Sequence, residues 1–468
     1  MSTIVLFEDR LVRGLEPLTL TRPVFELVAG ALSQRERIER LSGQAVGHAS
    51  VRPRIVSWCR EAGMEDFLAA PPPAPWLFVN GRFLPDAQAW RVVSGLETGQ
   101  VLAAREELLA FRLDSNPVRA AVLARGEWGR EGPRAGALAA SKGADDWRSP
   151  FLEAREDPAD LILLESFLSH RRTFRRGSGP PSGGTPNLAS SGCILRHSSD
   201  LIACQERLLE ADLDALTASG EGVTRLKNAP GEGLHVQGDR VFMGAGARIS
   251  APAVFDSRSG PILIGSQAQV GPFTVLEGPM HLSGGTQVLG GRLAASHIGP
   301  GCRIRGEVAS SVFLGWTNKA HEGFVGHSYF GEWVNLGALT TTSNLKNTYG
   351  EIRVGIGSRQ RTGLQKLGSI VGDHTRTAIG SLLATGSLIG MGVNLHGATG
   401  LAPGWLPSFL WGVGKKARPY DLERFLTVAE RVLARRGKTL GPEERERLID
   451  AYRVTAAERE AYLADASR

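Results

Sequence analysis

A six-residue hydrophobic repeat runs through the second half of the sequence and restricts the folds open to it. Apolar residues stand at every sixth position in four runs, and a small residue, usually glycine, often follows them. The runs are Ile264, Val270, Leu276, Leu282 and Val288; Ile298 and Ile304; Phe324, Phe330 and Leu336; and Val371, Thr377, Leu383, Ile389 and Leu395. An α-helix cannot explain this pattern, because its period of about 3.6 residues would carry successive members around the axis. A sheet of hairpins would alternate with a period of about two.

A hexapeptide solenoid does explain the repeat, because each step of six residues is then one short strand and one turn. Three steps close a triangular coil in which the apolar residues point inward and glycine permits the corners. The pattern therefore predicts a left-handed parallel β-helix over residues 234–400. Breaks in the phase near 294–298 and 345–370 predict loops that leave the coil.

The rest of the chain reads as three further segments. Residues 1–170 are predicted to form an α/β domain, with buried strands at TIVLF (3–7) and WLFVNGRFLP (76–85) and a helical period at 160–168. Residues 171–233 are predicted to hold a linker, rich in Arg, Gly, Pro and Ser, followed by an amphipathic helix at 198–218. Residues 401–468 are predicted to form a helical tail, with Asp421 capping its first helix and Pro442 starting another.

The charge and the cysteines indicate which binding partners and which cellular compartment to expect. The chain has 468 residues and a net charge of only +6, with short basic clusters, so solvated surface arginine is favoured over nucleic-acid binding. Attraction for phosphorylated small molecules fits the charge equally well. The four cysteines lack metal-ligand spacing, and no signal peptide or membrane-length apolar run is found, which predicts a cytoplasmic protein without a structural metal.

Polar residues gather in one stretch of the solenoid, TNKAHEGFVGHSYFGEWVNLGALTTTSNLKN (317–347). They cannot all point into the prism, where unpaired polar groups would be destabilising. We therefore expect them to point outward or into a groove between subunits of a threefold assembly.

This stretch resembles the acetyltransferase half of the GlmU family, the bifunctional N-acetylglucosamine-1-phosphate uridylyltransferase and glucosamine-1-phosphate acetyltransferase. The segments that carry the resemblance are KAHEGFVGHSYFGEWVNLGALTTTSNLKN, KLGSIVGDHTRTAIG (366–380) and GPILIGSQAQVGPFTVLEGP, and they are most similar to a divergent GlmU-like branch of sugar nucleotidyltransferases. The resemblance implies a homotrimer that transfers an acetyl group from acetyl-CoA to an amino-sugar phosphate, in the synthesis of nucleotide sugars of the UDP-N-acetylglucosamine type.

The resemblance also implies roles for individual residues. Acetyl transfer to an amine needs a base for the ammonium proton and a donor for the developing oxyanion. His321 aligns with the family's base, and Asn344 with the residue that supports it. Asn335 matches the residue that contacts the amino sugar. The positions that hold acetyl-CoA in the family correspond to Ala338, Ala378 and Ile379. Four other histidines of the solenoid have no such matching partner residues and are expected to be ordinary surface or core residues: His297, His327, His374 and His396.

Two departures concern the phosphate of the acceptor. Phe324 stands where the family usually has tyrosine, and Ala309 where it usually has a phosphate-binding lysine. The basic residues that could replace them are Arg305, Lys319, Lys346 and Lys366.

The N-terminal segment contains PLTLTRP (17–23), which is similar to the PLT-x-x-x-P start of sugar nucleotidyltransferases. That family places a glycine-rich loop before this motif and a lysine after it, whereas Val24 stands at the lysine position here. Arg13 and Arg22 are the candidate nucleotide-binding residues. Asn80 is the candidate for the metal position, which the family fills with aspartate, and Mg²⁺ would be needed if this domain is active.

Three hypotheses therefore stay open: an acetyltransferase with a nucleotidyltransferase-like domain, a bifunctional enzyme with an active uridylyltransferase, and a non-catalytic β-helix trimer that binds a sugar nucleotide. Release of coenzyme A separates the third from the others, and release of pyrophosphate separates the second from the first.

Overall fold

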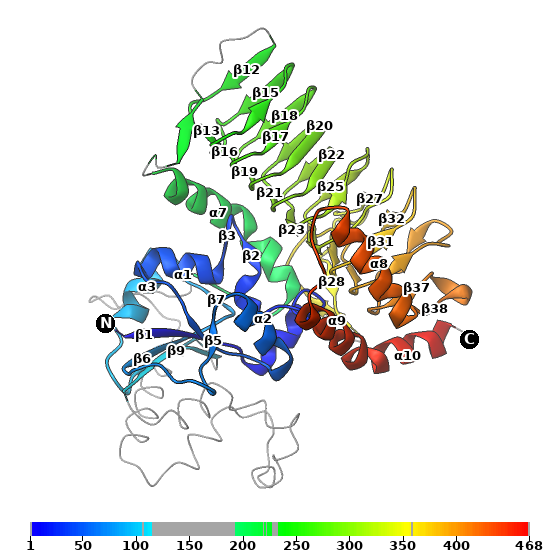
Figure 1. Ribbon diagram of the computed structural model, residues 1–468. Helices are drawn as coiled ribbons and strands as arrows, with labels where there is room; N and C mark the ends of the chain where they lie inside the picture. The colour runs from blue at the N-terminus through cyan, green and yellow to red at the C-terminus, as the bar shows by residue number, and fades with distance from the viewer. Residues whose placement is uncertain are drawn as a thin grey trace. The chain divides into compact units, whose positions relative to one another are not determined.

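The computed structural model describes residues 2–104, 107–114, 192–218, 220, 222–226, 233–356 and 359–466 (Figure 1). The chain forms two compact units. The first unit consists of Met1–Leu15, Arg22–Glu26 and Ser33–Arg196, and the second of Glu16–Thr21, Leu27–Leu32 and His197–Arg468. The predicted helical segment at 160–168 and the predicted boundary between 170 and 171 lie outside the described residues.

The first unit is built on a six-stranded sheet with the order β5-β4-β1-β6-β9-β8. Its strands are β1 (Thr3–Phe7), β4 (His48–Ser50), β5 (Glu65–Asp66), β6 (Trp76–Asn80), β8 (Val101–Ala104) and β9 (Glu107–Leu113). A short antiparallel pair adds β7 (Phe83–Leu84) and β10 (Cys193–Ile194). Among its described residues, the α-helices are α1 (Gln34–Ser42), α2 (Val56–Glu61) and α3 (Ala87–Ser94), and the 3-10 helices are Arg10–Leu15, Val24–Glu26 and Pro53–Ile55.

Strand β1 lies at the centre of this sheet because its apolar side chains on both faces are buried. It is parallel to β4 on one side and to β6 on the other, and β6 is antiparallel to β9. One face of the sheet packs in a cluster that includes Leu6 and Val79, and the other in a cluster that includes Phe7 and Phe78. The strand predicted at TIVLF is confirmed, and the segment WLFVNGRFLP (76–85) contains two strands, β6 and β7, rather than one.

The second unit is a parallel β-helix whose coils stack in register from β12 to β37 (Figure 1). One sheet contains β11 (Val223–Arg225), β13 (Val241–Gly244), β16 (Ile262–Ile264), β19 (Met280–Leu282), β21 (His297–Ile298), β23 (Val312–Gly315), β26 (Tyr329–Glu332), β30 (Ser369–Val371), β33 (Ser387–Ile389) and β36 (Trp405–Leu406). The fold class predicted from the six-residue repeat is confirmed.

The other sides of the coil contain further strands. They are β12 (Leu234–Gln237), β14 (Arg248–Ile249), β15 (Ala253–Asp256), β17 (Gln269–Val270), β18 (Thr274–Glu277), β20 (Gln287–Ala294), β22 (Arg303–Ala309), β24 (Asn318–Lys319), β25 (Phe324–Gly326), β27 (Thr341–Thr342), β31 (Arg376–Thr377), β32 (Leu382–Leu383), β34 (Asn394–Leu395), β35 (Leu401–Ala402), β37 (Leu410–Trp411) and β38 (Arg418–Pro419). The short strands β2 (Val28–Ala29) and β3 (Leu32–Ser33) pair with each other.

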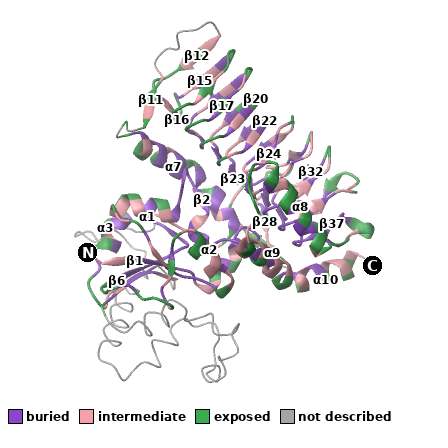
Figure 2. Cartoon of the chain, in the orientation of Figure 1, coloured by how far each residue is buried: buried purple, intermediate pink, exposed green. Residues whose placement is uncertain are grey.

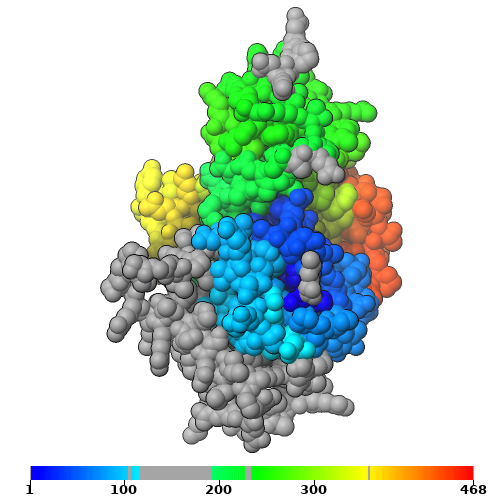
Figure 3. All heavy atoms as spheres, turned by 90° about the vertical axis from the view of Figure 1, so that its left-hand side faces the viewer, coloured from blue at the N-terminus to red at the C-terminus, as the bar shows by residue number. Residues whose placement is uncertain are grey.

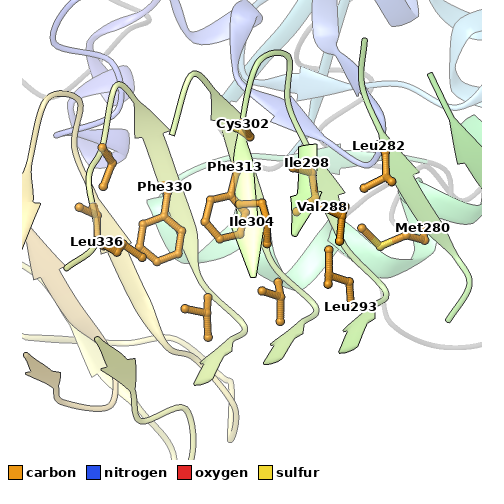
Figure 4. Close-up of a cluster of buried hydrophobic side chains, with 14 of the residues drawn as sticks. Met280, Leu282, Val288, Leu293, Ile298, Cys302, Ile304, Phe313, Phe330 and Leu336 are labelled. Carbon is orange, nitrogen blue, oxygen red and sulfur yellow. The ribbon is translucent and has the colours of Figure 1, made fainter. Parts of the chain in front are cut away.

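The core of the second unit is the column of inward side chains that the repeat predicts. Leu282, Val288, Ile298 and Phe330 stack inside the coil (Figure 4). One predicted member is displaced, because Phe324 is only half buried and its neighbour Val325 takes the inward position.

The coils are not all of equal length, and this explains the breaks in the repeat. Ile264 pairs with Leu282 after 18 residues, but Leu282 pairs with Ile298 after 16 and Ile298 with Phe313 after 15. The predicted loop near 294–298 is therefore wrong, because the chain stays in the coil and simply shortens it. The loop predicted at 345–370 does exist, since Phe330 pairs with Val371.

This excursion carries an antiparallel hairpin of β28 (Arg353–Val354) and β29 (Gln360–Arg361). Figure 3 shows the excursion in yellow, projecting beside the green coils.

Four helices complete the second unit: α7 (Ser198–Thr217), α8 (Leu422–Ala434), α9 (Pro442–Val454) and α10 (Ala456–Ala466). The cap predicted for α8 is confirmed, since the Asp421 carboxylate accepts a hydrogen bond from the Arg424 amide at 2.9 Å. Helix α8 buries Phe425 and Leu426 against Met391 and Phe409 of the solenoid, while its other face is exposed (Figure 2). No helix among the described residues is long and apolar enough to span a membrane.

Two buried histidines make the stability of the second unit depend on pH. The Nδ1 atoms of His281 and His297, on neighbouring coils, lie 3.1 Å apart, so the pair shares one proton between them. Burial lowers the pKa of His281 to about 4, and burial followed by the charge of His281 lowers the pKa of His297 further. Because both pKa values are lower in the fold than in the unfolded chain, their contribution is complete above about pH 6.5 and is lost as the pH falls toward 4.

We predict that replacing both histidines with apolar residues reduces this pH dependence. Leu263 and Val312 occupy the equivalent positions on the flanking coils, so the double variant His281→Leu/His297→Val keeps a compatible shape. The urea midpoint of the native protein should fall more steeply between pH 7 and pH 5 than that of the variant. When the free energy of unfolding is plotted against pH, the slopes for the two proteins should differ by about 1.4 kcal/mol per pH unit for each proton taken up on unfolding. Parallel slopes would contradict this assignment.

Candidate functional site

The histidine predicted as the base, His321, is not paired with the asparagine predicted to support it. The side chain of His321 is exposed, and its backbone oxygen accepts a hydrogen bond from Lys319 at 2.9 Å. The side chain of Asn344 instead meets His327, with Asn344 Nδ2 and His327 Nδ1 2.9 Å apart. The histidine that contacts Asn344 is therefore His327, which was predicted to be an ordinary surface or core residue.

The sequence did contain a signal for this pairing. Phe313 and Phe330 are register partners on adjacent coils and are separated by 17 residues. One step of 17 residues back from Asn344 reaches His327, whereas His321 is 23 residues away. The local length of the coil, rather than the similarity of the motif, identifies the histidine that shares an edge of the solenoid with Asn344.

The corner at His327 is closely packed on one side. His327 has a left-handed backbone with φ of 48°, as do Ala295 and Ser310 with φ of 46°. A Cβ at Gly326 would lie 2.5 Å from Cζ of Phe324 and 2.6 Å from Nδ2 of Asn344, so a larger residue there would displace one of these side chains. The ring of Phe324 therefore lies beside the amide that contacts His327.

The surroundings of His327 favour its neutral form. Burial, and then the positive charge of Lys366, lower the pKa of His327 to about 4. Lys366 is exposed, and its neighbour Leu367 donates a backbone hydrogen bond to the carbonyl of Asn344 at 2.9 Å. Near pH 7 the imidazole of His327 therefore carries no charge and has a lone pair available to accept a proton.

Two predicted lysines are engaged by the protein itself. Lys319 is 2% exposed and takes the inward position next to Ile304, and its Nζ donates to the carbonyls of Arg305 at 2.6 Å and His321 at 2.9 Å. Burial lowers the pKa of Lys319 to about 8. The prediction that Lys319 binds substrate is therefore wrong, because its ammonium group lies inside the coil. Lys346 donates to the carbonyl of Glu351 at 2.6 Å within the excursion.

Asn335 lies on another side of the coil. Its Oδ1 accepts a hydrogen bond from Asn318 Nδ2 at 3.0 Å, and on the next coil its register partner is Arg376. Among the described residues, no hydrogen bond joins Asn335 to His321, His327 or Asn344.

The three residues predicted to hold acetyl-CoA meet at one corner. Gly380 donates a backbone hydrogen bond to the carbonyl of Ala338 at 2.7 Å, which places Ala338 beside Ala378 and Ile379 on adjacent coils. Ile379 is 78% exposed. Ala338 precedes β27 and Asn344 follows it, so this corner and the corner of His327 bound the same side of the coil.

The PLTLTRP motif does not form a phosphate loop. Glu16–Thr21 belongs to the second unit, where Leu20 packs with Met391 and Phe409 and the Thr21 hydroxyl donates to Asp373 at 2.7 Å. In the first unit, Arg13 is exposed on the 3-10 helix Arg10–Leu15 and Arg22 is buried. Val24, at the position of the family's lysine, is buried as well.

Asn80 ends β6 at the carboxyl edge of the sheet in the first unit, as the sequence suggested. Its Nδ2 donates to Asp9 Oδ2 and to the carbonyl of Leu108, both at 2.8 Å. Its Oδ1 accepts from the backbone of Arg82 at 2.9 Å.

Comparison with known proteins finds one family match and several similar sequences. Residues 4–127 match a family described as "Sugar nucleotidyl transferase". A bifunctional sugar-1-phosphate nucleotidylyltransferase/acetyltransferase of Sulfurisphaera tokodaii is 38% identical over 85 residues, which are 18% of this chain and 21% of that protein. The bifunctional protein GlmU of Methanocaldococcus jannaschii is 37% identical over 73 residues, 16% of this chain and 18% of that protein. The matches thus span about a fifth of these curated relatives.

Among solved structures, AntD, an N-acyltransferase from Bacillus cereus determined with dTDP and 3-hydroxybutyryl-CoA, is 15% identical. The match covers 44% of this chain and 93% of that one with a TM-score of 0.17, which is too low to bear on fold or activity. The matched sequences thus confirm two likenesses, to a sugar nucleotidyl transferase family near the N-terminus and to the bifunctional GlmU proteins.

We predict that removing the charge of Lys366 raises the pKa of His327. In Lys366→Gln, the protonated imidazole no longer faces a nearby cation, so its pKa should rise above about 4 without reaching the ordinary 6.5, because burial remains. The measurement is a proton–carbon NMR titration, with the exposed His321 as an internal reference.

Lys346→Gln is the matched control, because the ammonium group of Lys346 is held by the carbonyl of Glu351. It should leave the titration of His327 unchanged. An unchanged or lower pKa of His327 in Lys366→Gln would show that Lys366 does not act on this imidazole.

Proposed function

We propose that the chain is an acetyl-CoA-dependent N-acetyltransferase that acts on an amino-sugar phosphate, with His327 as the general base. The observation that carries this proposal is the contact between His327 and Asn344 beside the exposed Lys366. The similarity to bifunctional sugar-1-phosphate enzymes supports the substrate class. We further propose a homotrimer in the cytoplasm, a setting that suits the free thiols of the described cysteines.

The chemistry requires a base with an open nitrogen. The amine of the acceptor attacks the thioester carbonyl, its proton passes to Nε2 of His327, and the C–S bond breaks to release coenzyme A as the thiol after reprotonation. For Nε2 to accept a proton, Nδ1 must carry the hydrogen and donate it to an oxygen. The amide of Asn344 supplies that oxygen by turning over, since its O and N atoms occupy nearly the same positions.

The depressed pKa of His327 links this base to the acceptor's phosphate. A base with a pKa of about 4 is available at neutral pH but weak, because proton-transfer efficiency is greatest when the pKa is near the working pH. A phosphate bound by Lys366 would cancel the charge that lowers the pKa of His327. The acceptor would then raise the basicity of the residue that activates it.

The acyl donor is proposed to bind at the corner of Ala338, Ala378 and Ile379. This corner bounds the same side of the coil as His327, and Leu382 on that side is 42% exposed. An apolar strip of this kind suits the pantetheine arm of coenzyme A.

The test is thiol release from acetyl-CoA across a panel of amino-sugar phosphates. His327→Ala should lose activity by about 100-fold or more, which is the usual contribution of a general base. His321→Ala is the control and should retain activity within about twofold, because its side chain is exposed and does not contact Asn344. Equal activity of His327→Ala and the native protein would exclude His327 as the base.

The second candidate, a β-helix trimer that binds a sugar nucleotide without catalysis, is favoured by one observation, the low pKa of His327. If no coenzyme A is released from acetyl-CoA with any amino sugar, and the pKa of His327 stays near 4 with sugar phosphate bound, the non-catalytic function replaces the acetyltransferase proposal.

A further inference from the structure

The carboxyl edge of the sheet in the first unit is where an open α/β sheet usually binds its ligands. A nucleotidyltransferase that uses Mg²⁺ would need free carboxylate oxygens there, because Mg²⁺ is bound by one or two carboxylates together with water and substrate phosphates. The polar side chains at this edge include Asp9 after β1, Asn80 at the end of β6, and Glu107 at the start of the antiparallel β9.

A single buried arginine, Arg82, already forms ion pairs with both carboxylates. Arg82 is 0% exposed. Its guanidinium donates two hydrogen bonds to Asp9, from Nε to Oδ1 at 2.8 Å and from Nη2 to Oδ2 at 2.5 Å. Its Nη1 donates to Glu107 at 2.9 Å and to the carbonyl of Leu195 at 2.8 Å. Arg196 contacts the second oxygen of Glu107.

Asn80 completes this arrangement as an amide rather than a carboxylate. Its NH₂ group donates to Asp9 and to the carbonyl of Leu108, and its oxygen accepts from the backbone of Arg82. Burial alone would lower the pKa of Arg82, but the charges of Asp9 and Glu107 raise it, so this cation is permanent. Among the described residues, no group of three or more His, Cys, Asp or Glu side chains could hold a metal ion.

We infer that the guanidinium of Arg82 occupies the place of the divalent cation at this edge of the sheet, so that the described residues of the first unit support no metal-dependent nucleotidyl transfer. The residues present do not fit Mg²⁺, because the fixed cation uses the oxygens that the metal would need. A purely structural ion pair would show the same contacts, but it would permit metal-dependent activity elsewhere in the unit.

The experiment uses the full chain and two readouts. The native protein should release no pyrophosphate from a panel of nucleoside triphosphates and sugar phosphates, with Mg²⁺ or Mn²⁺ present. Its melting temperature should not change with Mn²⁺. In Arg82→Met, Asp9 and Glu107 lose their common partner, so Mn²⁺ should raise the melting temperature by several degrees.

Arg112→Met is the matched control, because Arg112 lies on β9 as Glu107 does and donates to the carbonyl of Ser94 rather than to a carboxylate. It should behave like the native protein. Metal-dependent pyrophosphate release by the native chain would overturn the inference, whether or not Arg82→Met folds. Stoichiometric Mn²⁺ binding to the native chain that is lost in Asp9→Asn would overturn it equally.

A second, independent observation concerns a row of outward side chains on the solenoid. Arg303, Asn318, Asn335 and Arg376 are register partners on four successive coils. The residue after each one points inward and is buried, namely Ile304, Lys319, Leu336 and Thr377, so the row itself faces out. Asn318 donates to Asn335, which leaves the NH₂ group of Asn335 directed away from that bond.

The end of helix α8 adds two more arginines beside this row. Leu433 is buried, and Lys438 lies with its Nζ 5.0 Å from the centre of the Trp316 ring, which stacks on Trp333. Trp316 and Trp333 each stand two residues before an asparagine of the row. Arg435 and Arg436 lie between these two anchors, so they are held against the same part of the solenoid.

The four arginines have no negative partner among the described residues. None of Arg303, Arg376, Arg435 and Arg436 forms an ion pair, although arginines on nearby outward positions do, such as Arg305 with Glu322 at 2.7 Å. The Nε of Arg303 is buried without a hydrogen-bond partner. Burial, and then the charge of Arg303, lower the pKa of Arg436, while burial and Arg435 also lower that of Arg376.

The helix dipole explains only two of these four arginines. Arginines at the end of a helix are stabilised by its C-terminal dipole, which accounts for Arg435 and Arg436. It does not account for Arg303 and Arg376, which stand on the solenoid. A surface that offers guanidinium and amide donors, without a carboxylate, suits an anion with several acceptor oxygens.

We propose that Arg303, Arg376, Arg435 and Arg436 form a phosphate-binding site with the amide of Asn335. Calorimetric titration of the full chain with inorganic phosphate and with pyrophosphate, in 150 mM NaCl, tests this. Saturable binding is expected, and Arg303→Gln or Arg436→Gln should weaken it by about tenfold or more. The control Arg292→Gln, whose arginine is paired with Glu277, should bind as the native protein does. Absent binding, or equal binding by all variants, would overturn the proposal.

Discussion

Backbone hydrogen bonding between successive coils is the constraint on which the second unit depends. Parallel strands lie about 4.8 Å apart, so each residue stacks directly on its register partner in the next coil. An inward column must then be apolar along its whole length, and an outward column brings together residues that are far apart in sequence. The pair of Asn344 and His327, the Asn318–Asn335 row and the two stacked tryptophans all arise from this one geometry.

The periodic part of the fold could be predicted from sequence, because one apolar residue every six is a property of the coil itself. The details of the site could not, because they depend on how many residues each coil contains. An assumed constant length gave Phe324 an inward position that Val325 holds, and the family resemblance paired Asn344 with His321, whereas its side chain contacts His327. Lys319 shows a further limit, since a lysine inside the coil is tolerated only because two carbonyls meet its ammonium group.

In the first unit, the sequence identified strands and the place of Asn80, but not what meets it. Local pattern shows that a side chain stands at the end of a strand, whereas the pairing of Arg82 with Asp9 and Glu107 joins residues that are 73 and 25 positions apart. The PLTLTRP motif is a related case. Its resemblance predicted a nucleotide loop, while the chain uses Leu20 and Thr21 to pack against the solenoid. Buried contacts of this kind are set by tertiary structure and leave no local signature.

The membership of residues 16–21 and 27–32 in the second unit limits how this protein could have been assembled in evolution. The chain passes between the units several times before it reaches Ser33, so no single cut separates two complete halves. Exchange of the N-terminal half by one recombination event would remove segments that belong to the β-helix. An N-terminal part that no longer binds a metal would for this reason be retained, since the solenoid uses its residues as part of its own structure.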